Sequence, residues 1–241
     1  YRHFMQKKLL NHCNLTVFSD PVVKFIFDNN SIKAIDTQSG KRISCNKLIL
    51  TTGTFLNGLI HIGNKKTPAG RFDEAPSTGL SEQLKKYNFK MGRLKTGTPP
   101  RLDSRSINFK NLEEQFADDQ PYFFSFLTKK NINKQVSCCL TYTNEKVHKI
   151  IKKNLKLSAM YSGNIQGVGP RYCPSVEDKV VKFSDKSRHQ IYLEPEGLKS
   201  HVIYPNGISN SLPAEIQQEI CNNINGLENV KIIRPGYAIE Y

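Results

Sequence analysis

Apolar and polar residues alternate in short segments over the first fifty positions, and this pattern predicts a small antiparallel β meander. Turn residues separate its three apolar segments. The predicted strands are Val22 to Phe27, Ile32 to Asp36 and Ile43 to Leu50. The end of the last segment, Leu48 to Thr52, is a short apolar run that stops at Gly53. Because it is apolar throughout, it is expected to lie inside an α/β sheet.

Further along, apolar positions recur at helical spacing in several segments and are mixed with short β-type runs, so the chain belongs to the α/β class. The expected helices are Arg2 to His12, Thr78 to Tyr87, Glu145 to Leu155, Ser175 to Phe183 and Pro213 to Ile224. The other expected strands are Leu15 to Phe18, Gln190 to Leu193 and Lys231 to Arg234. Gly92 to Arg101 contains a double proline, which predicts a shaped basic loop and a domain boundary there.

Composition limits the class of protein. The chain has 241 residues and a net charge of +14, which suits a partner rich in phosphates, although an AT-rich genome would also favour lysine. No apolar run is long enough to cross a membrane and no signal pattern begins the chain. The six cysteines and six histidines lack metal-binding spacing. We therefore expect a cytoplasmic protein without a metal site, and a piece of a longer chain.

Cys173 has the sequence surroundings of a reactive thiol. Ser175 and Asp178 have the spacing of a capping box, which would begin a helix just after Cys173, and Arg171 lies two residues before it. A helix N-terminus and a nearby cation both lower the pKa of a cysteine. The alternative is a buried structural cysteine, and alkylation by iodoacetamide at neutral pH would separate the two.

The standard phosphate-binding motifs are missing. The stretch from Gly53 to Gly58 has the glycine spacing of a Walker A loop but continues Leu59-Ile60 in place of the lysine and hydroxyl residues, and no GxGxxG follows a strand. On this basis alone the chain is an α/β enzyme fragment with one activated cysteine.

Three longer blocks extend this interpretation: Leu50 to Gly58 (LTTGTFLNG), Gly92 to Arg101 (GRLKTGTPPR) and Gly167 to Asp178 (GVGPRYCPSVED). With shorter matches such as Arg234 to Tyr241 (RPGYAIEY), they make the chain resemble the MnmG (GidA) family of flavoproteins, which modify the wobble uridine of certain tRNAs. The resemblance covers essentially the whole chain.

The resemblance implies a fold and a domain organisation. Residues 1–100 would be part of a glutathione-reductase-type, Rossmann-like FAD-binding domain with the β meander. Residues 101–241 would be mostly an inserted α/β domain associated with NADH, in which about 169–178 return to the flavin. The family's GxGxxG fingerprint, its second cysteine and its C-terminal helical region are not among these 241 residues.

The resemblance also implies site residues. The residues expected at FAD are Val22, Thr52, Gly53 and Ser77. The stretch expected at NADH consists of Gly169, Pro170, Arg171, Tyr172, Cys173, Pro174, Ser175, Val176, Glu177, Asp178, Lys179, Val180, Val181, Lys182 and Phe183. In the family, with the GTPase MnmE as partner and a homodimer as the assembly, a carbon from methylene-tetrahydrofolate and an amine from glycine or ammonium are joined to uracil C5.

Within that chemistry Cys173 is the expected catalytic residue, because a thiolate added at C6 would make uracil C5 nucleophilic. Glu177 and Asp178 could act as acid or base, but capping and the helix dipole also explain them. Arg93, Lys95 and Arg101 could contact tRNA phosphates, or could simply be solvated charges on a packed loop.

Three other functions remain open. The first is a TrmFO-like, folate- and FAD-dependent tRNA uridine methyltransferase, although members of that group are shorter in the region that corresponds to Asn108 to Tyr161. The second is a non-catalytic tRNA-binding protein in which Cys173 only packs. The third is a flavin reductase for small molecules, which the motifs disfavour.

The domain interpretation gives a first prediction. Since the dinucleotide fingerprint is not among these 241 residues, the purified 241-residue chain is expected to be colourless and without turnover. Absorbance spectroscopy measures this directly, and a stoichiometric yellow flavin on this chain would contradict the predicted domains.

Overall fold

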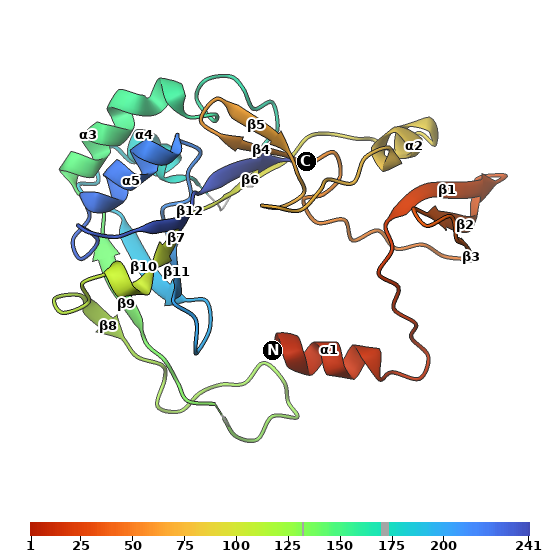
Figure 1. Cartoon of the computed structure of the whole chain (residues 1–241), viewed down its shortest axis with the longest axis horizontal. Coiled ribbons are helices and arrows are strands. Elements are labelled where there is room, and N and C mark those ends of the chain that lie inside the picture. Colours follow the sequence, from red (N-terminus) through yellow and green to blue (C-terminus); the bar gives the residue numbers. More distant parts are fainter. Residues whose placement is uncertain (132, 170–173) are drawn as a thin grey trace.

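The computed structural model describes residues 1–131, 133–169 and 174–241. In these residues the chain is a mixed α/β protein with three antiparallel sheets (Figure 1), so the predicted α/β class is confirmed. Cys173, the predicted catalytic residue, lies outside the described residues, as do its neighbours Pro170, Arg171 and Tyr172.

The predicted meander is present and packs against one helix. Helix α1 (Arg2–Leu10) precedes the three-stranded sheet, and α2 (Leu80–Lys86) packs on it. The strands, in sheet order, are β1 (Val22–Asp28), β2 (Ser31–Thr37) and β3 (Arg42–Ser44). Phe25 of β1 is buried against Leu80 and Leu84 of α2. The Gln83 side chain accepts a hydrogen bond from the Phe25 N–H at 2.8 Å and so fixes the helix to the strand.

The largest sheet has six strands, with helices packed on it (Figure 1). Its strands, in sheet order, are β12 (Ile232–Arg234), β7 (Arg101–Asp103), β11 (Val202–Asn206), β10 (Gln190–Pro195), β9 (Cys138–Tyr142) and β8 (Glu113–Gln115). The helices are α3 (Glu145–Asn154), α4 (Val176–Lys182) and α5 (Ala214–Asn222), with short 3-10 turns η1 (Ser104–Ser106) and η2 (Leu155–Leu157).

Buried side chains that alternate with exposed ones along the strands of this sheet form the main hydrophobic core. Ile191 and Leu193 of β10 are fully buried while Gln190 is exposed, as expected for a strand with one covered face. They pack with Ile151 of α3 and Val180 of α4 in one continuous hydrophobic cluster. The three helices therefore owe their positions to this apolar face.

A four-stranded sheet completes the fold, with strands in the order β5 (Lys65–Pro68), β4 (Leu59–Ile62), β13 (Tyr237–Glu240) and β6 (Lys95–Thr98). Its smaller core contains Ile60, Ala69, Tyr237 and Ile239.

The chain crosses twice between the four- and six-stranded sheets, and the two crossings pack against each other. Pro99-Pro100 joins β6 to β7, and Pro235-Gly236 joins β12 to β13. A Cβ on Gly236 would lie 2.7 Å from the Thr98 carbonyl oxygen, so the contact requires glycine. The buried Gln217 side chain accepts a hydrogen bond from the Gly236 N–H at 2.7 Å and donates one to its carbonyl at 2.9 Å.

Two predicted strands are wrong. Leu15 to Phe18 and Leu48 to Thr52 have no strand pairing in the described chain. Ile49 is 85% exposed. An apolar run becomes a central strand only when neighbours on both sides complete its hydrogen bonds, and the described residues supply none here.

The predicted loop from Gly92 to Arg101 is also wrong in part. Lys95–Thr98 forms β6 and Arg101 begins β7, so that only Pro99 and Pro100 interrupt the strands. Proline disrupts a ladder only where its missing N–H is needed, and both prolines lie between two strands of different sheets.

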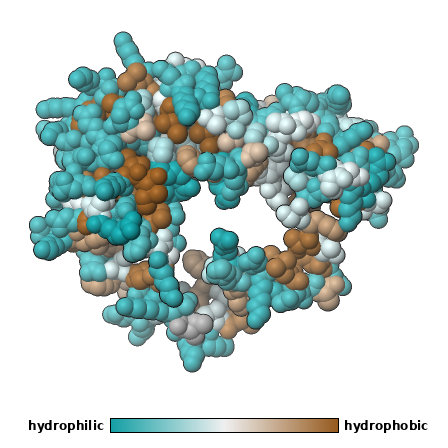
Figure 2. Space-filling model, in the orientation of Figure 1, coloured by the Kyte–Doolittle hydropathy of each residue, from teal (hydrophilic) through white to brown (hydrophobic). Residues whose placement is uncertain are grey.

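Polar and charged residues cover most of the visible surface, and hydrophobic residues form separate patches among them (Figure 2). Of the helices in the described part of the chain, none combines the length and apolar composition that crossing a membrane requires.

Candidate functional site

Helix α4 begins with the capping box that the sequence predicts. The Ser175 hydroxyl accepts a hydrogen bond from the Asp178 N–H at 3.1 Å, and the Asp178 carboxylate accepts one from the Ser175 N–H at 3.4 Å. Each side chain satisfies an N–H that the first helical turn leaves without a partner. The chain that emerges from residues 170–173 is therefore fixed in place from Ser175 onward.

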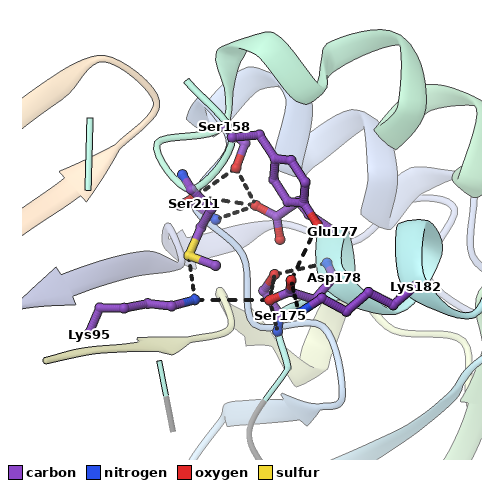
Figure 3. Close-up of polar contacts among 9 residues, drawn as sticks. Lys95, Ser158, Ser175, Glu177, Asp178, Lys182 and Ser211 are labelled. Atoms are coloured by element: carbon purple, nitrogen blue, oxygen red, sulfur yellow. Dashed lines mark hydrogen bonds and ion pairs between the residues drawn. The ribbon is translucent and has the colours of Figure 1, made fainter. Parts of the chain in front are cut away.

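Glu177, predicted as an acid or base, is fully buried and connects α4 to two other segments (Figure 3). Its Oε1 atom accepts hydrogen bonds from the Ser158 hydroxyl at 2.9 Å and from the Ser211 N–H at 2.9 Å. Its Oε2 atom is buried without a hydrogen-bond partner among the described residues. A buried carboxylate oxygen without a partner is costly, so Glu177 is the group in this cluster most open to an additional donor.

Asp178 is at the centre of a second polar network (Figure 3). Its carboxylate accepts a hydrogen bond from the Tyr161 hydroxyl at 3.2 Å, and lies 2.9 Å from the Lys182 ammonium and 3.9 Å from that of Lys95. Burial by itself would raise the pKa of Asp178, but the hydrogen bond from Lys182 and the charge of Lys95 outweigh it and lower that pKa. Burial and the charge of Asp178 raise the pKa of Tyr161 to about 12.

Lys95 brings β6 into this network. Its ammonium lies 2.7 Å from the Met160 sulfur as well as near Asp178. A Cβ on Gly169 would lie 2.5 Å from the Lys95 side chain, so Gly169, predicted to bind NADH, packs directly on this lysine. The Lys95 N–H also donates to the Val168 carbonyl at 3.0 Å. The segment that precedes residue 170 is thus held to β6 by backbone and side chain together.

A third cluster surrounds Glu240 of β13. The N–H groups of Gln166 and Gly167 donate to one Glu240 oxygen at 3.0 and 2.7 Å. The other oxygen lies 3.7 Å from the Arg93 guanidinium and 3.6 Å from the His61 ring. Burial lowers the pKa of His61, and the nearby Glu240 only partly offsets that effect.

Sequence reasoning missed the partners in these clusters. Ser158, Ser211 and Met160 carry no motif, and their roles come only from the packing of distant segments. Glu240 does lie in the matched block from Arg234 to Tyr241, but nothing local predicts that β4 and β13 pair and bring His61 beside it.

The three basic residues predicted at tRNA phosphates all have protein partners. Arg93 donates to the Asn57 carbonyl at 2.9 Å, and Lys95 lies in the Asp178 network. The Arg101 guanidinium pairs with Glu196, donates to the Pro99 carbonyl at 2.6 Å and lies over the Tyr204 ring at 4.4 Å. Their contact with phosphates remains a prediction.

Three of the four residues predicted at FAD line one cavity of about 770 Å³ beside the meander. Val22, Thr52 and Ser77 come from β1 and two separate loops, and they converge on this cavity. Gly53, the fourth, follows Thr52 directly and has a φ of +54°, in the left-handed region that favours glycine. The rest of the lining is mainly apolar and includes the partly buried Leu48 and the exposed Ile49 and Leu50. A cavity of this size and character is typical of a cofactor or small-molecule site.

Comparisons with known proteins agree along the whole chain. A sequence model of the family described as "Glucose inhibited division protein A" matches residues 1–241. The protein named "tRNA uridine 5-carboxymethylaminomethyl modification enzyme MnmG" from Thermodesulfovibrio yellowstonii is 54% identical over 241 residues, and its namesake from Aquifex aeolicus is 50% identical over 248. These matches cover 100% of this chain and 39% and 40% of the relatives, so the chain spans about two fifths of their length.

The fold agrees as well. The crystal structure of Aquifex aeolicus GidA in crystal form I matches with a TM-score of 0.92 at 50% identity, and form II matches with 0.90 at 48%. Both cover 100% of this chain, and 41% and 39% of the solved chains.

The Asp178 network generates a prediction about stability. Asp178→Asn removes the charge that faces Lys95 and Lys182 and is expected to cost about 1–3 kcal/mol of unfolding free energy at pH 7. The pKa of Asp178 is lowered on folding, so its contribution is complete above its ordinary value of 3.8 and is lost as pH falls through the lower folded value.

Urea unfolding of the wild type and of Asp178→Asn between pH 7 and pH 3 measures the difference in their unfolding free energies. This difference is expected to shrink as the pH falls. Asp185→Asn is the matched control, since that carboxylate is 75% exposed and should change stability little. A difference that persisted unchanged to pH 3 would contradict the assigned role of the charge.

Proposed function

Because this chain belongs to the glucose inhibited division protein A family, we propose that it is part of an enzyme that builds the 5-carboxymethylaminomethyl group on a tRNA uridine. The observation that carries the proposal is the family match over all 241 residues, together with relatives of that name at 50–54% identity over the whole chain. The substrate is then tRNA, and the modified base is the wobble uridine.

The cavity beside the meander is the proposed place for the flavin. The family resemblance implies that Val22, Thr52 and Ser77 contact FAD, and their convergence on one cavity supports the proposal. The apolar lining suits an isoalloxazine or adenine ring, and the turn at Thr52-Gly53 offers backbone N–H groups with close access. FAD, with NADH as the reductant, would supply the redox chemistry of the reaction.

The stretch from Gly169 to Phe183 is the proposed contact with NADH. Its described part is held from both ends, by Lys95 against Gly169 and by the capping box at Ser175. These contacts fix the described residues on both sides of positions 170–173. We further propose that residues 1–100 belong to the FAD domain and residues 101–241 mostly to the insertion. The consecutive strands β6 and β7 lie in different sheets, which is consistent with a boundary between them.

The proposed role of Cys173 follows from the chemistry of uracil. The Cys173 thiolate adds to C6 of the uracil ring and forms a C6–S bond. The electrons of the C5–C6 double bond then create an enolate. C5 then attacks the methylene carbon supplied by methylene-tetrahydrofolate. Loss of the C5 proton with departure of tetrahydrofolate leaves an exocyclic methylene at C5, and the amine of glycine or ammonium adds to that carbon. Departure of the thiolate from C6 then restores the ring. MnmE as partner, an amine from glycine or ammonium, and a homodimer complete the proposal.

The flavin site can be tested in the full-length protein. Ser77→Phe places a large ring in the cavity, and the purified variant is expected to lose most of its bound flavin absorbance. Ser187→Phe introduces the same ring at an exposed position outside the cavity lining and should retain flavin. Normal flavin content in a folded Ser77→Phe protein would show that the flavin lies elsewhere.

The catalytic role of Cys173 can be tested in the same protein with MnmE. Cys173→Ser is expected to abolish modification, because a hydroxyl remains protonated where a thiol ionises. Mass spectrometry of the tRNA nucleosides measures the product, with Cys13→Ser, an exposed cysteine, as the control. Modification at the normal rate would eliminate the proposed nucleophile.

A further inference from the structure

The connection between β8 and β9 carries an unusual concentration of exposed aromatic rings. We name residues 122–130 (YFFSFLTKK) the aromatic arm, and all of them are exposed. Tyr122, Phe124 and Phe126 are each at least 96% exposed, and Leu127 is 85% exposed. The arm belongs to a long connection between β8, an edge strand of the six-stranded sheet, and its neighbour β9, at the bottom of the view in Figure 1. Large apolar groups gathered on a surface mark a binding site more often than isolated ones do.

The arm has a local structure of its own. The Thr128 N–H donates to the Ser125 carbonyl at 3.0 Å, and the Leu127 N–H donates to the Ser125 hydroxyl at 3.3 Å. A turn thus lies in the middle of the arm, with Phe124 just before it and Phe126 inside it. Neither ring is buried to hold this turn, so both are available for contact with a partner.

Charge indicates what kind of partner fits. Lys129 and Lys130 lie three and four residues after Phe126, and the sequence contains no acidic residue between Asp119 and Glu145. The arm therefore carries two positive charges next to four aromatic rings. A partner with an apolar protein surface would contact the rings but not the lysines. A nucleic acid would contact both, because its bases stack on aromatic faces and its phosphates pair with cations.

We propose that the aromatic arm is a stacking platform for unpaired bases of tRNA. The inference rests on the proposed function and adds to it a surface that holds the substrate. Phe124 and Phe126 stack on bases exposed in a loop of the RNA, and Lys129 and Lys130 contact the adjoining phosphates. Specific RNA recognition uses single-stranded loops, whose bases can leave the helix and stack on such rings.

The test measures tRNA affinity of the full-length, flavin-loaded protein by fluorescence anisotropy at fixed salt. The double variant Phe124→Ala/Phe126→Ala is expected to raise the Kd for tRNA by about 30-fold or more, because each lost base–aromatic stack weakens binding by about 5- to 150-fold. Phe89→Ala, at a half-exposed ring outside the arm, is the matched control and should leave the Kd unchanged. Flavin content and thermal unfolding show that each variant is folded.

A second pair of variants separates stacking from simple apolar contact. Phe124→Trp/Phe126→Trp keeps aromatic faces and should retain the affinity, whereas Phe124→Leu/Phe126→Leu keeps apolar volume without an aromatic face and should weaken binding as the alanines do. Lys129→Gln/Lys130→Gln is expected to reduce the salt dependence of the Kd.

A Kd for tRNA within twofold of the wild type in the double alanine variant would overturn the inference. Leucine variants that bind tRNA as tightly as the wild type would overturn it too, because apolar contact without an aromatic face would then be sufficient. If the wild-type protein modifies tRNA while the arm variants bind normally, the inference about the arm fails and the proposed function stands. If the wild type neither binds nor modifies tRNA, both fail.

Discussion

The carboxylate of Asp178 connects three parts of the molecule through one buried group. It completes the cap of α4 through Ser175, holds Tyr161 on the segment that follows α3, and faces the ammonium of Lys95 on β6. Helix α4 belongs to the core of the six-stranded sheet, whereas β6 is an edge strand of the four-stranded sheet. The contact therefore links the six-stranded sheet to the four-stranded sheet.

Buried acidic side chains gather around this contact between the two sheets. Glu177 and Glu240 each receive backbone N–H groups from segments that have no regular structure, namely at Ser211 and at Gln166 and Gly167. Loops of this kind gain order from hydrogen bonds to charged acceptors, which are stronger than those between neutral groups. The carboxylates thus act as anchors for the loops that flank the proposed NADH stretch.

Local patterns predicted much of the fold. The meander, the capping box at Ser175 and the helices α3, α4 and α5 follow from alternation, helical spacing and turn residues, and all of them are confirmed. The edge strand β6 was missed because its sequence, Lys95–Thr98, has a glycine and few apolar residues, and only pairing with β13 makes it a strand. Leu48 to Thr52 failed for the opposite reason, since its apolar side chains face a cavity instead of neighbouring strands.

The candidate site also contains both residues that the sequence singled out and residues that it did not. Val22, Thr52 and Ser77 line one cavity, and their contact with FAD stays a prediction. The partners of Glu177 and Asp178 depend on contacts between distant segments and had no signal in the sequence. Such contacts depend on register and packing, which no local pattern encodes.

The paired crossings at Pro99-Pro100 and Pro235-Gly236 determine how the two larger sheets respond to force. Three of these four residues are prolines with a fixed φ, and the fourth is pressed against Thr98 and Pro100 and fastened by Gln217. Few soft torsions are left to act as a pivot. A ligand that shifts one sheet would therefore turn the other with it, so that strain introduced at one end of the protein reaches the opposite end as a rigid rotation.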